Sequence, residues 1–288
     1  MTVLVLGATG NVGPHVVAAL HDAGTTPNVL VRDGARAHEL LGDSAHVITG
    51  DVTDATLLAE AMTDVDSVLL LSPHSYSMAD LQLRVIREIR RTGARIVKVS
   101  GTSAAITPNG PHACRQHWEV ERVLAESGQP FVILRPNSFM QVLIAKQMIP
   151  ALQTSGVIPN PIAHSGISFI DARDVGAVAA RVLLGNDWDG QTLELTGPRS
   201  VTYADIAELV SDLLGKPVST VEATPAEVRA TLIGRGMADW EADHFQEMYQ
   251  LFRDGESEFV TTTVEDVTGT PARTIEAFLG EQLETASA

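Results

Sequence analysis

Three glycines near the start of the chain constrain its fold more than any other feature. Gly7, Gly10 and Gly13 follow a run of residues, 3–6, that is apolar at every position. Such a run is typical of a parallel strand that is covered on both faces. A helical pattern over 12–21 begins within the glycine-rich segment. The spacing therefore predicts a sharp strand-to-helix turn of the kind that holds the phosphates of a dinucleotide.

The same alternation of apolar runs and helical patterns continues through the first half of the chain. Further strands are expected at 29–31, 46–48, 67–71, 95–99 and 131–134. Helices are expected between them at 36–41, 54–63, 77–91 and 112–127. Six strands that alternate with helices predict an α/β fold, a Rossmann-type doubly wound parallel sheet. In this fold the ligand lies at the carboxyl ends of the strands.

The pattern changes after about residue 145. Prolines at positions 150, 159 and 161 interrupt it, and the chain is mostly helical from Thr202 onward. The elements expected between these points are strands at 167–170 and 192–195 and a helix at 174–184. We expect two domains: an NAD(P)-binding domain over 1–150, to which 173–198 return, and a smaller, mostly helical substrate-binding lobe over 151–288.

The composition narrows the range of partners. The chain has 36 acidic and 20 basic residues, which gives a formal net charge of −16. An acidic surface repels phosphate backbones, so we expect a small-molecule substrate, no nucleic acid and no membrane. The single cysteine, Cys114, excludes an intramolecular disulfide. No apolar run approaches the ~20 residues that cross a bilayer. We expect a cytoplasmic protein that is a monomer or a homodimer.

The glycine-rich loop is the predicted phosphate-binding site. Its backbone amides and the positive end of the following helix suit an anion, and a residue without a side chain leaves space for the pyrophosphate. The residues expected to contact the cofactor here are Gly7, Thr9, Gly10, Asn11, Val12 and Gly13. Two alternatives stay open. The glycines could serve only a structural turn, and Thr9 and Asn11 could simply cap the helix.

The residues after the second expected strand indicate which dinucleotide binds. Arg32 lies about 20 residues beyond the glycines, where a cation binds the 2′-phosphate of NADP and a carboxylate binds the ribose of NAD. Arg36 follows one helical turn later. We therefore predict NADPH as the cofactor, held by Arg32 and Arg36. Alternatively, Arg32 is an ordinary solvated loop residue, and the adjacent Asp33 either pairs with it or repels the phosphate.

Asp51 and Val52 follow the third expected strand. At this place an Asp side chain and the next backbone amide commonly meet the adenine ring, so we expect both residues to bind the cofactor. The alternative is that Asp51 simply caps the helix that begins near Asp54.

Together these segments resemble the NmrA-like family of atypical short-chain dehydrogenases over nearly the whole chain. The segments that carry the resemblance are 7–13, 29–33, 50–52, 71–73, 98–101, 117–121, 127–130, 134–140, 169–175, 195–198 and 268–274. The resemblance implies further cofactor contacts from Leu71, Ser72, Pro73, Ser100, Pro136 and Asn137. It also implies either an NADPH-dependent reductase, quinone oxidoreductases included, or a redox-sensing regulator that binds NADP without turnover.

The acid–base pair of typical short-chain dehydrogenases, Tyr-x-x-x-Lys, is missing from the helix expected over 112–127. Counting back from Ser127 and Gly128, the lysine position falls on His117 and the tyrosine position on Ala113. His117 resembles the histidine that NmrA-like quinone oxidoreductases carry here. The resemblance implies that His117 is catalytic and binds the nicotinamide ribose; the alternative is a satisfied core or surface histidine.

Other candidate residues carry weaker signals. Tyr76, in the loop after the fourth expected strand, is the second catalytic candidate, as a replacement acid or only as a loop residue that packs on the lobe. No metal site is expected, because His112 and His117 have no third ligand. An aromatic cluster at helical spacing is expected either in the core or in the substrate pocket. Its members are Trp240, His244, Phe245, Tyr249 and Phe252.

The leading hypothesis is an NADPH-dependent oxidoreductase that transfers hydride to a quinone-like or other conjugated small molecule. Such an acceptor delocalises its developing negative charge, so it needs less acid catalysis than a simple ketone. The alternatives are a non-catalytic NADP-sensing regulatory protein and an isomerase or cyclase on the same fold.

Overall fold

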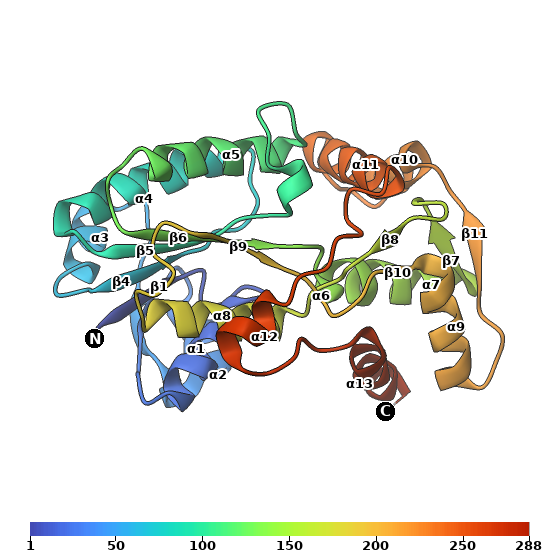
Figure 1. The fold of residues 1–288 in the computed structure, drawn as a ribbon, viewed down its shortest axis with the longest axis horizontal. Helices are drawn as coiled ribbons and strands as arrows, with labels where there is room; N and C mark the ends of the chain where they lie inside the picture. The colour runs from blue at the N-terminus through green and yellow to red at the C-terminus, as the bar shows by residue number, and fades with distance from the viewer. Residues whose placement is uncertain (288) are drawn as a thin grey trace.

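A seven-stranded parallel sheet forms the centre of one lobe in the computed structural model, which describes residues 1–287 (Figure 1). The strand order is β3-β2-β1-β4-β5-β6-β9. The strands are β1 (Val3–Leu6), β2 (Asn28–Val31), β3 (His46–Thr49), β4 (Ser67–Leu70), β5 (Arg95–Val99), β6 (Phe131–Pro136) and β9 (Thr192–Leu195). The order reverses direction between β1 and β4, which is the point where doubly wound sheets bind ligands. The predicted fold class is confirmed.

Helices cover both faces of the sheet (Figure 1). One face carries α1 (Gly13–Asp22), α2 (Gly34–Leu41), α8 (Ala172–Leu183) and α12 (Thr263–Thr268). The other carries α3 (Ala55–Ala61), α4 (Met78–Thr92) and α5 (His112–Ala125). Short 3-10 turns occupy Gly42–Ser44 (η1) and Ser103–Ala105 (η2). The sheet is therefore buried on both sides.

Strand β1 shows why a strand of this sheet can be apolar at every position. Side chains alternate between the two faces of a strand. Val5 packs in the hydrophobic cluster that contains Val16 of α1, and Leu4 packs in the opposite cluster with Ile86 of α4. These side chains are at most 1% exposed.

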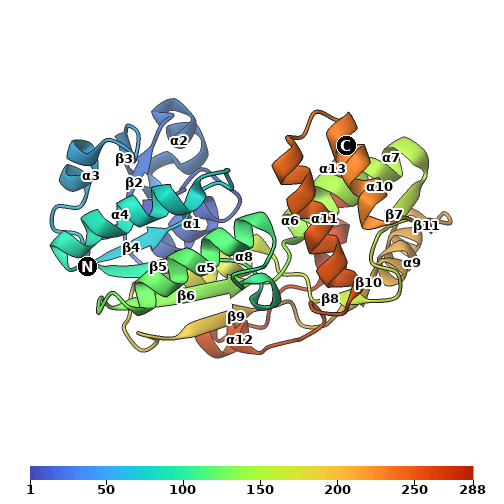
Figure 2. The same cartoon turned by 90° about the horizontal axis from the view of Figure 1, so that it is seen from above.

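A second lobe lies beside the sheet (Figure 2). Its helices are α6 (Met140–Leu143), a π-helical turn η3 (Ile144–Met148), α7 (Ile149–Ser155), α9 (Tyr203–Leu214), α10 (Pro225–Gly234), α11 (Asp239–Arg253) and α13 (Ile275–Ser287). Its strands are β7 (Val157–Asn160), β8 (Gly166–Ile167), β10 (Val201–Thr202) and β11 (Ser219–Glu222), which pair as β10–β8 and β11–β7. Phe169, Tyr203 and Phe278 are buried in a core of its own.

The chain passes between the two lobes several times. After the first part of the second lobe it returns to the sheet as α8 and β9, as the sequence suggests. It returns once more as α12, which packs on α8 and β9. No sequence signal points to this second return, because α12 is a short helix and its partners lie about 80 residues earlier.

The strand predicted over 167–170 is mostly wrong. Only Gly166–Ile167 forms a strand, β8. The next residues pair their backbones with three separate segments: the N–H of Ser168 donates to the carbonyl of Ser257, the carbonyl of Ser168 accepts from Gly197, and Ile170 donates to Ser138. A segment whose partners change at each residue cannot continue as one ladder, although its residues are apolar enough to suggest one.

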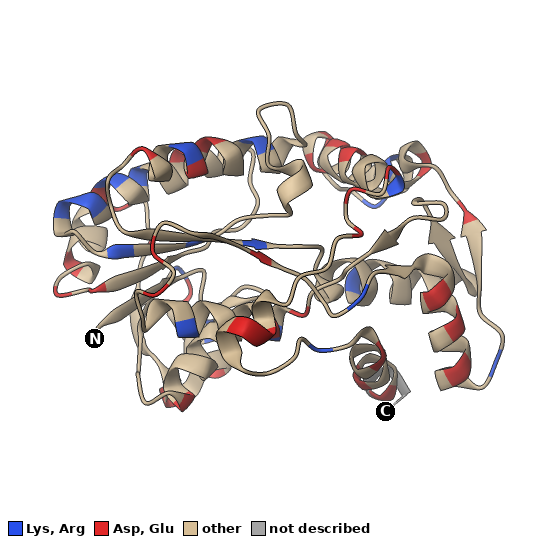
Figure 3. Ribbon diagram, in the orientation of Figure 1, with Lys and Arg blue, Asp and Glu red and all other residues tan. Residues whose placement is uncertain are grey.

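The charges are unevenly distributed over the elements (Figure 3). Helix α4 carries four arginines, whereas α9 carries three acidic residues and no basic one. Among residues 1–287, no helix has the length and apolar character needed to cross a bilayer.

Candidate active site

The glycine-rich loop between β1 and α1 turns as the spacing predicts. Gly7 has φ +76°, a left-handed conformation that favours glycine. A Cβ atom on Gly13 would lie 2.2 Å from the Gly7 carbonyl oxygen, so only glycine lets the helix start this close to the loop. At Gly10 the nearest atom would be 3.4 Å away, and the residue is exposed. Gly10 therefore borders open space where a ligand can approach the backbone.

The amino end of α1 has no side chain that competes for its amides. The residue before the helix is Val12, no side chain caps the helix, and its first turn contains no acidic residue. The alternative that Thr9 or Asn11 caps the helix is therefore wrong. Because the first-turn N–H groups of a helix have no intrahelical acceptor, they stay available to an anion. The loop fits the pyrophosphate of a dinucleotide.

Asn11 instead meets the second lobe. Lys146, in the π-helical turn, donates to its side-chain oxygen at 3.0 Å, and both residues are exposed. A cation thus lies next to the glycine-rich loop in a chain with a large net negative charge. Sequence reasoning missed Lys146, because it is 135 residues from its partner.

The residues after β2 leave two guanidinium groups free. Arg32 and Arg36 are exposed, and neither has an ion-pair partner within residues 1–287. Asp33 caps α2 by accepting a hydrogen bond from the Arg36 N–H at 3.0 Å. The suggested Arg32–Asp33 pairing is therefore wrong: the carboxylate turns to the helix, and both cations face solvent.

Asp51 lies near Arg32 but does not cap α3. Its carboxylate accepts from the backbone and hydroxyl of Thr53 at 2.8 and 2.7 Å, whereas Asp54 caps α3. The capping alternative for Asp51 is thus wrong. The hydrogen bonds from Thr53 lower the pKa of the Asp51 carboxyl, and the Arg32 guanidinium adds to this effect. Asp51 is exposed and Val52 half-buried at this edge.

His117 lies on α5 with its ring almost fully buried, at 5% exposure. Its Nδ1 atom is 2.9 Å from Nζ of Lys98 on β5, and Nζ also donates to the carbonyl of Val99 at 2.7 Å. Lys98 is completely buried. The signal that could have pointed to Lys98 is a cation inside an otherwise apolar strand, since charged residues are almost never fully buried without a partner.

Two further imidazoles stand near His117. His74, in the loop after β4, has its ring centroid 5.9 Å from that of His117 and 5.6 Å from that of His244 on α11. His74 is exposed, whereas His244 is buried with its Nδ1 atom unpartnered. Three histidines from the sheet domain and the second lobe therefore meet at the carboxyl end of the sheet.

The environment of these rings disfavours their charged forms. Burial, followed by Lys98 and the other two histidines, lowers the pKa of His117 well below its usual value. Burial and the neighbouring His74 lower the pKa of His244 to about 3. Burial lowers the pKa of Lys98 to about 7, and the Glu121 carboxylate opposes this shift.

Tyr76 does not join this group. It is 68% exposed, stacks on His112 with ring centroids 4.9 Å apart, and lies 6.2 Å from Trp240. No ring contact or hydrogen bond joins Tyr76 to His117 within residues 1–287. The loop after β4 thus brings His74 to His117, and it places Tyr76 in a separate aromatic group.

The other predicted cofactor residues occupy different environments. Leu71 and Ser72 are half-buried and Pro73 is exposed, and the Ser72 hydroxyl accepts from Gln82 at 2.8 Å. Ser100 is buried and donates to Glu121 at 2.5 Å. Glu121 also pairs with Arg135 at 2.5 Å, which neutralises its charge.

Asn137 has no side-chain group left for a cofactor. Its amide nitrogen donates to the Ser168 hydroxyl and the Ser257 carbonyl, and its oxygen accepts from the Ser138 N–H and the Ser257 hydroxyl. These contacts use both donors and both acceptor sites of the amide. Asn137 is also 2% exposed, and the preceding Pro136 is buried. A direct side-chain contact from Asn137 is therefore not supported, and the residue holds chain segments together.

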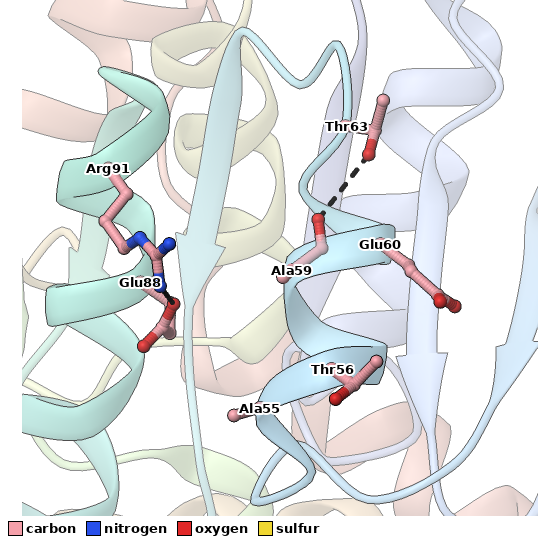
Figure 4. A pocket seen from close by; sticks show the side chains of 7 residues that line it. All are labelled: Ala55, Thr56, Ala59, Glu60, Thr63, Glu88 and Arg91. Atoms are coloured by element: carbon pink, nitrogen blue, oxygen red, sulfur yellow. Dashed lines mark hydrogen bonds and ion pairs between the residues drawn. The ribbon is translucent and has the colours of Figure 1, made fainter.

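Cys114 and two surface cavities offer no further reactive group. Burial raises the pKa of Cys114 to about 12, as expected for an unreactive buried thiol. A surface depression of about 500 Å³ lies between α3 and α4 and contains the ion pair between half-buried Glu88 and exposed Arg91 (Figure 4). A cavity of about 120 Å³ inside the second lobe is bordered by Tyr203 and Tyr249. Among residues 1–287, no group of His, Cys, Asp and Glu side chains is arranged to hold a metal ion.

The sequence model of the NmrA-like family matches residues 1–279. The chain belongs to the NmrA-like family. An NAD(P)H azoreductase of Xenophilus azovorans is 32% identical to this NmrA-like chain over 278 residues, which cover 96% of each protein. Quinone oxidoreductase 2 of Escherichia coli K12 is 27% identical over 245 residues, 84% of each protein.

A solved structure shows that the similarity to the quinone oxidoreductase also holds for the whole fold of this NmrA-like chain. The NADPH-dependent quinone oxidoreductase of Escherichia coli, determined with NADPH, superposes with a TM-score of 0.87. The match covers 99% of this chain and 100% of that one at 26% identity. The family resemblance expected from the sequence is therefore confirmed.

Proposed function

We propose that this chain is an NADPH-dependent reductase that transfers hydride to a planar, conjugated acceptor such as a quinone. The observation that carries the proposal is the environment of His117. Its Nδ1 atom is hydrogen-bonded to Nζ of Lys98, and its Nε2 atom has no hydrogen-bond partner within residues 1–287. The exposed ring of His74 lies beside the His117 ring. One ring nitrogen of His117 is thus free for a substrate at the carboxyl end of the sheet that carries the glycine-rich loop.

The cofactor assignment rests on the two ends of the dinucleotide site. The loop from Gly7 to Gly13 offers uncapped helix amides to the pyrophosphate, and Arg32 and Arg36 offer unpaired cations to a 2′-phosphate. Asp33, the carboxylate that would favour a ribose hydroxyl instead, is held by α2. NADPH in the related quinone oxidoreductase and NAD(P)H in the name of the azoreductase support the same assignment.

The acceptor class follows from what the site offers a substrate. Helix α5 contains no tyrosine, so a carbonyl would find no phenol to protonate it. A quinone needs less acid catalysis than a simple carbonyl, because the negative charge that develops after hydride transfer is delocalised. One proton donor then suffices. His117 is suited to be that donor. The imidazole rings of His74 and His244, one from each lobe, lie next to it and offer flat faces to a planar substrate.

Turnover by the purified protein tests the proposal. The absorbance of reduced nicotinamide is followed with a benzoquinone, a naphthoquinone, an azo dye and a saturated ketone, and cofactor binding is measured by calorimetry. We expect oxidation of NADPH with a conjugated acceptor and none with the ketone. His117→Ala should lower that turnover about 10²-fold, the low end for a positioned acid, and leave the Kd for NADPH within a few-fold. Tight NADPH binding without turnover of any acceptor would instead support the NADP-sensing alternative.

A further inference from the structure

Lys98 occupies a position where an ammonium group is costly. Every residue of β5 is buried, and the Lys98 side chain has no exposed surface. Moving a charge out of water costs several kcal/mol unless partners replace the lost hydration. A lysine at such a position is therefore expected either to form a strong ion pair or to have a functional role.

Lys98 has no ion pair. None of the ion pairs within residues 1–287 includes it. Glu121, whose charge acts on Lys98, already accepts from Arg135 and Ser100, each at 2.5 Å. The partners of Nζ are the Val99 carbonyl at 2.7 Å and His117 Nδ1 at 2.9 Å. The contact with His117 is thus the distinctive feature of this lysine.

This contact selects one tautomer of His117. An ammonium group can only donate, so the protonated form of Lys98 gives an N–H to Nδ1. The neutral imidazole then carries its own proton on Nε2, the nitrogen that has no partner within residues 1–287. His117 is 5% exposed, and its Nε2 atom is not completely shielded from solvent. This N–H therefore borders solvent beside exposed His74.

A neutral imidazole is a very weak acid on its own. It can release the Nε2 proton at a useful rate only if Nδ1 gains a proton in the same event, since imidazolate would otherwise form. The usual solution, an imidazolium, is disfavoured here because burial and Lys98 lower the pKa of His117 well below neutrality. Lys98 is the group that touches Nδ1, and its pKa of about 7 suits a residue that gives up a proton.

We propose that Lys98 is a positioning residue that acts through His117: it fixes the Nε2–H tautomer and supplies the proton that passes through the ring. The inference rests on the proposed reductase function. Once a quinone-like acceptor has taken hydride from the reduced nicotinamide dinucleotide, it carries an oxyanion. The Nε2–H bond of His117 breaks as the O–H bond forms, and an Nζ–H bond of Lys98 breaks as Nδ1–H forms.

The step balances in atoms and electrons. The nicotinamide loses two electrons with the hydride, the acceptor gains them, and the proton that the acceptor receives is replaced by the one that leaves Lys98. Lys98 ends as a neutral amine. The site is restored when water protonates Nε2 and the Nδ1 proton returns to Nζ.

The positioning role is tested without catalysis. Lys98→Met keeps the length and apolar stem of the side chain and removes the ammonium, a change that buried sites often tolerate. In 15N-histidine-labelled protein, the nitrogen shifts of His117 should report the Nε2–H tautomer in the wild type and a mixture of tautomers in Lys98→Met. Lys216→Met, the same change at an exposed lysine of the second lobe, should leave His117 as in the wild type. Unchanged His117 signals in folded Lys98→Met would overturn the proposal.

The proton supply is tested by turnover against pH. Burial lowers the pKa of Lys98, so its proton is present below about pH 7 and is lost as the pH rises through that value. The charged and titratable groups that act on this pair are Glu121, His74 and His244. Quinone turnover should therefore fall above about pH 7 in the wild type. In Lys98→Met it should be about 10²-fold lower with an unchanged KM, and without that alkaline decline.

A measurement on the wild type stays decisive if Lys98→Met does not fold. A plot of the turnover rate against the deuterium fraction of H₂O–D₂O mixtures should be curved, because two protons move in one step. A straight line in this plot would overturn the proton relay. A wild type that turns over no acceptor would refute the proposed function alone, because the His117 tautomer in Lys98→Met still decides the role of Lys98.

Discussion

A single exposed arginine is expected to decide which dinucleotide this protein prefers. Arg32 pairs with no carboxylate in the described part of the chain, residues 1–287, and the neighbouring carboxylate of Asp33 accepts from the first turn of α2. Arg32→Ala should weaken NADPH binding by about 1.5–3 kcal/mol, the contribution of a charged hydrogen bond, and leave NADH binding nearly unchanged. Calorimetric Kd values for both cofactors check this. Arg91→Ala, an exposed arginine of α4 that pairs with Glu88 (Figure 4), is the control that should change neither. Equal losses for NADPH and NADH would remove Arg32 from the 2′-phosphate site.

At the scale of elements, the turn from β1 to α1 separates a glycine needed for binding from one needed for folding. Gly10→Val places its side chain in open space, so it should leave the melting temperature nearly unchanged and abolish NADPH binding. Gly13→Val would drive Cβ to within 2.2 Å of the Gly7 carbonyl oxygen, a backbone atom that has no room to move. It should destabilise the fold by at least about 1–3 kcal/mol, as overpacking does. Thermal unfolding measures the stability of both variants, and calorimetry measures their NADPH binding. Full NADPH affinity in Gly10→Val would show that the loop is only a structural turn.

At the scale of the whole molecule, the buried amide of Asn137 joins the end of β6 to segments that reach the second lobe. Asn137→Ala removes the acceptor of the buried Ser257 hydroxyl and of the Ser138 N–H, and it takes one of several partners from the Ser168 hydroxyl and the Ser257 carbonyl. The free energy of unfolding should fall by at least about 1–3 kcal/mol, as measured by urea denaturation. Asn160→Ala is the matched control, because that half-buried amide bonds only within its own turn. A loss at Asn160 as large as that at Asn137 would show that the link between segments adds nothing.

The sequence by itself determined the sheet, its helices and the glycine-rich turn from β1 to α1. These features depend on local patterns: residues such as Val5 and Leu4 are apolar because each faces a helix layer, and Gly13 is glycine because a Cβ would meet the turn before it. Such constraints act within a few residues along the chain or repeat in every strand. The sheet, its helices and this turn could therefore be predicted from the sequence, and so could the position of His117 on its helix.

Only the tertiary structure decided which side chains surround His117. Lys98 comes from β5, His74 from the loop after β4 and His244 from α11 of the second lobe, so no local pattern relates them to His117. The sequence singled out Tyr76 in this loop and not His74, yet the path of the loop turns His74 to His117 and Tyr76 to His112. Hydrogen bonds and ring contacts form at distances of a few ångströms in space, whatever the separation along the chain, and the packing of the lobes sets that spacing.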